Sequence, residues 1–285
     1  MTLERTALRR GFDRAAPHYE RHAWLQREVA GRLLDLPQAE SLAPRWIADL
    51  GCGSGRLTAE LKRRWPRAAV SGLDIAPAML AAARHHRHWY RTFGLLCGDL
   101  AVTPFRDGSI DLLVSNLAVQ WSAPGDTVFA EWRRILRPGG AVLFSTFGPA
   151  TLHELRRAWR AADEAVHVHD FVDLHEIGDR LVAAGFKNPV LGSERLEVYE
   201  PDVETVMRGL RAIGAGNADH ARRRGLTGKA AYGRMRQAYE CERTEHGLPV
   251  TWEAIIGAAF APAANGPAKA GDVIPLAELR HRRPM

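Results

Sequence analysis

From Arg45 to Phe147 the chain alternates short apolar runs with stretches of helical periodicity, and this alternation constrains the fold more than any other feature. The run WIADL at 46–50 precedes the helical pattern RLTAELKRRW at 56–65, and further apolar runs and helical patterns follow as far as 151–159. The runs are too continuous for strands with one exposed face. The pattern therefore predicts an α/β fold with a doubly wound, mostly parallel sheet that helices cover on both faces.

The segments on either side of this alternation predict a division of the chain. A further strand is expected at 188–200, and its pairing with the last strand would place the helical segment between them over the ligand-binding edge of the sheet. The predicted parts are an N-terminal helical lid at 1–44, a core at 45–200, a helical insertion over the active site at 201–248, a last sheet strand at 249–260 and a flexible tail at 261–285.

Composition excludes several classes of protein. With 46% hydrophobic and 25% charged residues, the chain is typical of a folded globular protein. It has no apolar run of about 18 residues and no leader-like start, so we expect neither a membrane span nor a secretory signal. Three scattered cysteines without a CxxC pair favour a reducing cytoplasm. The net charge of +6 indicates an acidic partner, which could be nucleic acid, an anionic membrane or a protein.

A glycine-rich loop, DLGCGSG at 49–55, connects the first predicted strand to its helix. Such a turn brings the backbone close to a nucleotide-like ligand, although an ordinary tight turn can also use it. Its glycines, Gly51, Gly53 and Gly55, occupy every second position, which breaks the GxGxxG pattern of dinucleotide-binding folds. No GxxxxGK[ST] pattern is present either. A nicotinamide, flavin or nucleoside-triphosphate site is therefore not expected.

Acidic residues follow the next two predicted strands at the same edge of the sheet. Asp74 ends the second strand, where its carboxylate could accept hydrogen bonds from both hydroxyls of a ribose. Asp99 follows the third strand and could accept the exocyclic amine of an adenine. The alternative for both residues is an ordinary helix cap. The three features together predict a nucleoside across the carboxyl ends of the strands.

DLGCGSG, GLD at 72–74, GDL at 98–100 and LRPGG at 136–140 together resemble the ordered motifs of class I S-adenosylmethionine-dependent methyltransferases. The last of these is a turn before the fifth strand in that family. The resemblance implies a seven-stranded Rossmann-like sheet, with S-adenosyl-L-methionine as cofactor and S-adenosyl-L-homocysteine as product. The cofactor-binding residues expected on this basis are Tyr19, His22, Gly51, Cys52, Gly53, Gly55, Asp74, Ile75, Met79, Asp99, Leu100 and Asn116.

From Phe12 to Phe260 the chain also resembles, more narrowly, the malonyl-acyl-carrier-protein O-methyltransferase family. The segments SNLAVQW at 115–121, FSTFGPATLHELRRAW at 144–159 and MRGLRAIGAGNA at 207–218 carry this resemblance, and GAAF at 257–260 departs from it. It implies methylation of the free carboxylate of a malonyl thioester, the step that primes pimeloyl synthesis for biotin. The alternatives are an assembly or binding protein with a methyltransferase fold, a methyltransferase for another small carboxylic acid, and a nucleic-acid methyltransferase, for which the chain lacks an NPPY-type motif.

A carboxylate acceptor needs alignment more than deprotonation, because a carboxyl group with a pKa near 4 is already ionised at neutral pH. We therefore assign no residue as a catalytic base and expect a mechanism that depends on proximity. Tyr19 and His22, three apart on a helix, could close over the cofactor. The alternative for these two residues, and for Trp121, is that they only pack inside the protein. The candidates for the acceptor pocket are Gln120, Trp121, His153 and Arg156.

The remaining predictions concern metal and partners. His167 and His169 lie beside Asp170, but no further ligand is evident, so we expect no metal site. The expected partner is malonyl-loaded acyl carrier protein, with malonyl-coenzyme A as a second substrate, and no nucleic acid or membrane. The acidic surface of the carrier protein would bind a basic docking face on this chain. The alternative is that these basic residues only form a solvated helix surface. The candidates for this face are Arg208, Arg211, Arg222, Arg223, Arg224 and Lys229.

Overall fold

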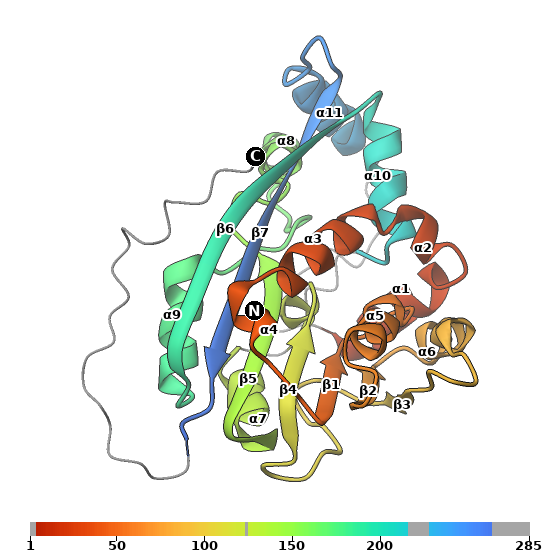
Figure 1. The fold of residues 1–285 in the computed structure, drawn as a ribbon. Helices are drawn as coiled ribbons and strands as arrows, with labels where there is room; N and C mark the ends of the chain where they lie inside the picture. The colour runs from red at the N-terminus through yellow and green to blue at the C-terminus, as the bar shows by residue number, and fades with distance from the viewer. Residues whose placement is uncertain (1–3, 123–124, 216–227, 264–285) are drawn as a thin grey trace, which may run out of the picture.

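The computed structural model describes residues 4–122, 125–215 and 228–263, and a seven-stranded sheet runs through them (Figure 1). The strand order is β3-β2-β1-β4-β5-β7-β6, in which only β7 runs antiparallel to its neighbours. This confirms the predicted α/β fold with a mostly parallel sheet. The strands are β1 (Trp46–Leu50), β2 (Ala69–Asp74), β3 (Gly94–Cys97), β4 (Ile110–Ser115), β5 (Leu136–Phe147), β6 (Lys187–Glu200) and β7 (Leu248–Phe260).

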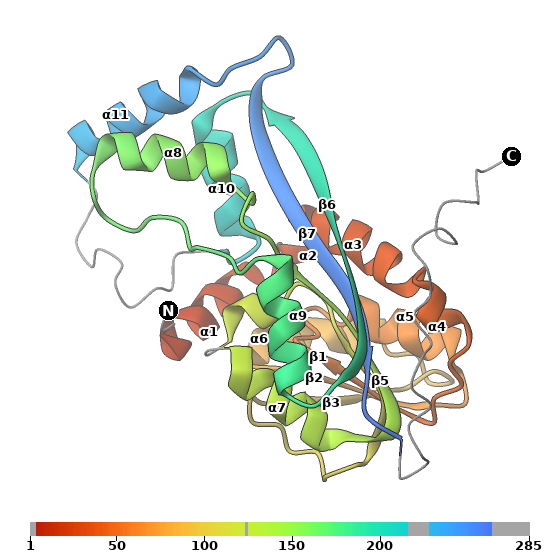
Figure 2. The same cartoon turned by 90° about the vertical axis from the view of Figure 1, so that its left-hand side faces the viewer.

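The central strands are buried on both faces, as their continuous apolar runs predict. Every residue of β4 is buried, because helices pack against each side of the sheet (Figures 1 and 2). One face carries α7 (Gly125–Ile135) and α9 (Leu174–Ala183), and their contacts include Trp132 and Leu181. The other carries α3 (Trp24–Leu34), α4 (Pro37–Glu40) and α5 (Arg56–Arg64).

The order of the strands reverses at β1, which pairs with β2 on one side and β4 on the other. In open parallel sheets the crevice for a ligand opens at such a switch point, beyond the carboxyl ends of the strands. The glycine loop follows β1 and Asn116 follows β4, so both lie at this crevice. The remaining helix of the parallel half, α6 (Pro77–Ala83), begins shortly after β2 ends.

The N-terminal segment, predicted as a single lid, has two different positions. Helices α1 (Arg5–Ala15) and α2 (Tyr19–His22) lie at the ligand edge, and Phe12 of α1 contacts Trp121. Helix α3 instead packs against the sheet and buries Val29 and Leu33 completely. Only the first half of the segment therefore lies where a lid would have to be.

Strands β6 and β7 form a long antiparallel pair that extends past the end of β5 (Figure 2). Pairing of β5 with β7 stops at Phe147 and Ala254, whereas β6 stays paired with β7 as far as Leu248. This overhang carries a helical cluster at the ligand edge. Its members are α8 (His153–Ala162), α10 (Val203–Ala212) and α11 (Lys229–Glu240).

One detail differs from the expectations, and another lies mostly outside the described residues. The segment LRPGG, expected as a turn, lies within β5, where the register to β4 shifts between Ile110 and Leu112. The tail is predicted to start at 261, and residues 264–285 lie outside the described part of the chain. None of the described helices is long and apolar enough to cross a lipid bilayer.

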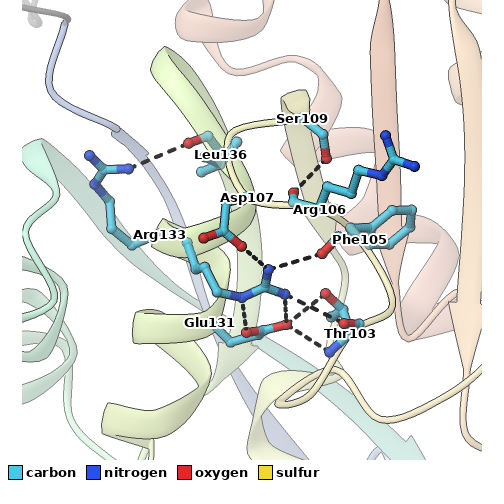
Figure 3. Close-up of polar contacts among 9 residues, drawn as sticks. Thr103, Phe105, Arg106, Asp107, Ser109, Glu131, Arg133 and Leu136 are labelled. Atoms are coloured by element: carbon cyan, nitrogen blue, oxygen red, sulfur yellow. Dashed lines mark hydrogen bonds and ion pairs between the residues drawn. The ribbon is translucent and has the colours of Figure 1, made fainter.

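A polar network anchors the loop that follows β3 to helix α7 (Figure 3). The Glu131 carboxylate accepts hydrogen bonds from the backbone amide and the hydroxyl of Thr103, both at 2.7 Å. Arg134 donates to Glu131 and to the carbonyl oxygen of Phe105. Burial raises the pKa of Glu131, but its hydrogen bonds with Arg134 and Thr103 outweigh this and leave the pKa below its usual value. The loop that carries Asp99 is thereby held in place.

Candidate active site

The glycine loop adopts backbone conformations that side chains would disturb. Gly51, Gly53 and Gly55 have φ angles of 79°, 53° and 80°. A Cβ atom on Gly51 would lie 2.3 Å from the Cβ of Ala118, and one on Gly55 would lie 2.5 Å from the Cβ of Ala83. The missing side chains therefore let β1 turn tightly into α5, whose first backbone amides face a ligand at this edge.

Asp74 connects the end of β2 to the glycine loop. Its Oδ2 accepts a hydrogen bond from the backbone amide of Gly53, and its Oδ1 accepts one from that of Ala76, both at 2.8 Å. Burial raises the pKa of this carboxyl group to about 6, although these two hydrogen bonds oppose the increase. Each carboxylate oxygen has a second lone pair, so the side chain can still accept hydrogen bonds from a ligand.

Asp49 is a second buried carboxyl group at this edge, and the sequence analysis did not assign it to the site. Its Oδ2 accepts a hydrogen bond from the hydroxyl of Thr58 at 2.6 Å, whereas its Oδ1 is buried without a hydrogen-bond partner among the described residues. Burial raises its pKa to about 7. An acidic residue at the end of a buried strand, directly before a glycine loop, was the signal that could have identified it.

A cavity of about 320 Å³ lies over the carboxyl ends of β1, β2 and β4. Its lining combines acidic and apolar side chains with bare backbone, as a nucleoside site requires. Helix α1 adds Arg5, Leu8 and Phe12, which the sequence analysis did not assign. The predicted residues that line it are Tyr19, Gly51, Gly53, Asp74, Ile75, Met79, Asp99, Leu100, Asn116 and Trp121.

A groove of about 740 Å³ continues from this cavity between α3 and α5. Tyr19, Gly51, Gly53 and Asn116 line both spaces, and Asp49 lines the groove. The Tyr19 ring covers the glycine loop, since a Cβ on Gly53 would meet it at 3.8 Å. Burial and the nearby Asp74 raise the pKa of the Tyr19 hydroxyl well above its usual range. A ligand longer than a nucleoside therefore has room to extend past Tyr19 toward Asp49.

Asp99 lies in the cavity but already has two partners. Its Oδ1 accepts a hydrogen bond from the backbone amide of Ala101 at 2.8 Å, and its Oδ2 lies 3.1 Å from Nε of Arg5. The ion pair connects helix α1 to the loop after β3. An adenine amine at Asp99 would therefore share the carboxylate with Arg5 or displace it.

Trp121 forms part of the wall between the cavity and a second, larger chamber. Its ring makes edge contacts with Phe12 and with His169, at centroid distances of 5.8 and 5.6 Å. The second chamber, of about 670 Å³, lies between the β6–β7 overhang and the helical cluster. Its aromatic lining consists of Trp121, Phe147, Trp159, Phe171, Tyr232 and Trp252. The site thus has a nucleoside cavity and an aromatic chamber on two sides of one indole ring.

Comparisons with known proteins identify the family of the chain. The methyltransferase-domain family matches residues 48–144. A malonyl-acyl-carrier-protein O-methyltransferase from Laribacter hongkongensis is 41% identical over 289 residues, which cover 99% of this chain and 97% of that protein. Another, from Xylella fastidiosa, is 44% identical and covers 90% of this chain and 87% of that protein. The chain belongs to the malonyl-acyl-carrier-protein O-methyltransferase family. The predicted resemblance is confirmed.

Solved structures support the fold of this family member. The YcgJ protein of Bacillus subtilis superimposes with a TM-score of 0.59 at 15% identity and covers 84% of this chain. A phosphoethanolamine N-methyltransferase of Haemonchus contortus in complex with S-adenosylhomocysteine has a TM-score of 0.52 at 17% identity, covering 88% of this chain and 57% of that one. The cofactor of this methyltransferase is S-adenosyl-L-methionine, as predicted.

Three predicted cofactor residues of this family member do not line the nucleoside cavity. His22 is exposed on α2 and does not line the cavity, whereas Tyr19 of the same short helix does. Gly55 packs against Ala83 instead, and its role is to let the chain enter α5. Cys52 lines the adjoining groove and packs against Gly72, and burial raises the pKa of its thiol well above the usual value.

Two acceptor candidates, His153 and Arg156, lie outside both spaces. His153 is exposed, and its ring nitrogen Nδ1 lies 3.1 Å from the carbonyl oxygen of Ala150. Arg156 donates from Nη2 to the carbonyl oxygens of Thr151 and His169, at 3.1 and 3.0 Å. Its guanidinium group therefore connects α8 to the segments before and after it.

Of the other acceptor candidates, Trp121 lines the aromatic chamber but Gln120 does not. Gln120 lines a separate cavity of about 170 Å³, where its amide donates to the carbonyl oxygen of Leu117 at 2.8 Å. Asn116 is also held by the protein, since it donates to the carbonyl oxygen of Gln26 and accepts from the hydroxyl of Ser145. It still faces the cavity and the groove.

The two histidines of the segment 167–169 line the aromatic chamber. His167 stacks on Trp159 at a centroid distance of 3.7 Å, and its Nε2 lies 2.8 Å from Oδ1 of Asp163. His169 is buried against Trp121. Among the residues that the structure describes, no group of three His, Cys, Asp or Glu side chains is arranged to hold a metal ion.

The predicted docking face is only partly described. Arg208 is exposed on α10, whereas Arg211 and Lys229 line the aromatic chamber. The other three candidates, Arg222, Arg223 and Arg224, lie outside the described residues.

Proposed function

We propose that this chain transfers a methyl group from S-adenosyl-L-methionine to the free carboxylate of a malonyl thioester on acyl carrier protein. The product would be the malonyl methyl ester that primes pimeloyl synthesis for biotin. The observation that carries the proposal is the adjacency of the two cavities across Trp121 in a member of this family. One cavity suits a nucleoside, and the aromatic chamber would take the acceptor.

The residues present fit the cofactor. Asp74 would hold the ribose hydroxyls, and Ile75, Met79 and Leu100 would contact the adenine, because these side chains line the same cavity. Asp49 would hold the ammonium group of the methionine part, since its buried and unpartnered Oδ1 needs a cationic donor. The glycine loop leaves space that a Cβ atom would fill.

The chain's contribution to the reaction is alignment and dryness. When bound, the cofactor would supply an electrophilic methyl group on its sulfonium sulfur. A carboxylate oxygen of the acceptor would form a bond to this methyl group, and the electrons of the broken carbon–sulfur bond would stay on the sulfur. No proton moves, so a general base is not required. Trp121 and Phe147 keep water from the acceptor, because their rings form the chamber wall. Orienting the carboxylate there can lower the activation barrier by several kcal/mol, since positioning can contribute at most about 7–11 kcal/mol.

Initial rates of labelled methyl transfer test this function. We expect incorporation into malonyl carrier protein and none into acetyl carrier protein, which has the same arm without a carboxylate. Incorporation into free malonate or another small carboxylic acid at a higher kcat/KM would instead support the alternative acceptor. Cofactor binding without transfer to any of them would support a binding protein.

The proposed setting is the cytoplasm, where the free thiols Cys52, Cys97 and Cys241 would stay reduced. The net charge of +6 supports an acidic carrier as partner, with Arg208 on its docking face, and malonyl-coenzyme A as a second substrate. No nucleic acid or membrane takes part in this proposal.

A further inference from the structure

The aromatic chamber is far larger than a malonyl group requires. Its volume of about 670 Å³ lies within the range of about 300–1,000 Å³ that is typical of sites for drug-sized ligands. Its floor is apolar, since Phe147, Leu155, Trp159 and Trp252 are all buried. A ligand that fills this space must therefore present a long, largely uncharged body in addition to the group that is methylated.

The charged side chains that line the chamber, Arg211 and Lys229, are both cations. Arg211, in the last turn of α10, and Lys229, the first residue of α11, line it and are exposed. Neither side chain has a hydrogen bond or ion pair within the described residues, and no described Asp or Glu lines the chamber. The positive end of the α11 dipole adds to the potential at Lys229. The rim is therefore suited to an anion.

Contacts connect this rim to the aromatic wall. The rings of Tyr232 and Trp159 lie 6.4 Å apart, between centroids. Burial and the nearby Glu204 raise the pKa of the Tyr232 hydroxyl, whereas Arg211 and Arg236 oppose this increase. Trp159 in turn stacks on His167. A continuous aromatic surface thus leads from the two cations into the chamber.

We propose that this chamber binds the phosphopantetheine arm of the acceptor, with its phosphate held by Arg211 and Lys229. The inference rests on the proposed function, because a malonyl thioester reaches the site on such an arm. Pantetheine supplies the long uncharged body, and its phosphate supplies the anion at the rim. Carrier protein and coenzyme A share this chemistry, and the experiment distinguishes them.

The test compares malonyl thioesters of pantetheine, 4′-phosphopantetheine, coenzyme A and carrier protein as substrates. The first two differ only in the phosphate. For the unchanged protein we expect the phosphate to lower KM about tenfold, which is the value of one charge-assisted hydrogen bond near the surface. Arg211→Gln and Lys229→Gln should each remove most of this difference, because they should raise KM for the malonyl thioester of 4′-phosphopantetheine far more than KM for malonyl-pantetheine.

The matched control is Arg236→Gln, which removes the same charge from α11. Arg236 is exposed and does not line the chamber, and its ion pair with Glu204 is a surface pair at 3.5 Å. This variant should keep the preference for the phosphorylated arm. Equal losses for both pantetheine substrates in the Arg211 and Lys229 variants, or no loss in either, would overturn the proposal. A loss confined to carrier protein would also overturn it, because the cations would then contact the carrier and not the arm.

Calorimetry with unreactive 4′-phosphopantetheine and pantetheine separates this inference from the proposed function. Tighter binding of the phosphorylated compound, lost in Arg211→Gln, supports the arm site even if no malonyl thioester is methylated. Methylation of all the malonyl thioesters without any dependence on the phosphate would leave the function intact and exclude the arm site.

Discussion

At the scale of single residues, the site depends on buried carboxyl groups whose protonation the protein controls. The positions of Asp74 and the glycine loop could be predicted from sequence, because strand ends and missing side chains leave a direct trace in the spacing. Asp49 left a similar signal directly before the glycine loop, which the sequence analysis did not use, and only the structure shows that one of its oxygens is buried without a hydrogen-bond partner among the described residues. Two buried carboxyl groups with raised pKa values also make ligand affinity depend on pH.

Asp49 should make cofactor binding tighter as pH rises from about 5 to about 8. In the empty protein its carboxyl group has a pKa of about 7, so at lower pH it is mostly protonated and must lose a proton before it can hold an ammonium group. Affinity therefore rises with pH and levels off above 7. The same raised pKa makes the empty protein lose stability as pH rises through 7. Asp49→Asn, which stays neutral, should flatten the affinity profile measured by calorimetry, and an unchanged slope would contradict the assignment.

Gly51→Ala should destabilise the fold by at least about 2 kcal/mol and abolish cofactor binding. The added methyl group would lie 2.3 Å from the Cβ of Ala118, at a backbone φ of 79° that alanine rarely adopts. Chemical denaturation measures the first effect. Gly233→Ala is the control, because this position lies in α11 with nothing within 4 Å, and it should stabilise by about 0.5–1 kcal/mol. Equal effects of the two substitutions would contradict the argument.

At the scale of elements, the strands were more predictable than the placement of helices around the acceptor. Continuous apolar runs predicted the buried strands, whereas the pairing of β6 with β7 entered only as the condition for placing the helical segment over the ligand edge. The orientation of α8 was not predictable, because Leu152 directly before it adopts a φ of 53°. This turn buries Glu154, Leu155 and Trp159 and leaves His153 outside. The chamber itself combines residues from 121 to 252, so no local pattern indicates it.

A substitution that loosens the helical cluster should weaken acceptor binding without affecting cofactor binding in the nucleoside cavity. Thr251 of the β7 overhang donates from its hydroxyl to the buried Glu154 of α8. Thr251→Val leaves that carboxylate without this donor, which costs about 1–3 kcal/mol. We expect faster amide exchange in α8 and a higher KM for the malonyl acceptor, with an unchanged cofactor Kd. Thr92→Val, at an exposed position, is the control. A weakened cofactor Kd would contradict this separation.

At the scale of the whole molecule, the proposed function requires a site that a long arm can reach while its carrier stays outside. The charge of +6 predicted an acidic partner without distinguishing its class, and membership of the family favours a carrier protein. Charge acts at a distance, so it should affect the encounter of the two proteins more than the chemistry.

Salt should therefore weaken the reaction with the carrier selectively. Raising ionic strength from about 0.01 M to about 1 M shortens the Debye length from about 30 Å to about 3 Å. We expect KM for malonyl carrier protein to rise at least tenfold over this range, and KM for the uncharged arm of malonyl-pantetheine to change little. The same salt dependence for both substrates would show that charge acts on the protein itself and not on the encounter.

The identity of the methylated product tests the central claim most directly. Malonyl carrier protein is incubated with the enzyme and S-adenosyl-L-methionine, and the arm is then analysed by fragment mass spectrometry. The account predicts one added methyl group, placed on the distal carboxylate of the malonyl unit, with one S-adenosylhomocysteine formed for each ester. A methyl group on the carrier protein's own side chains, or no transfer by a protein that binds the cofactor, would contradict it.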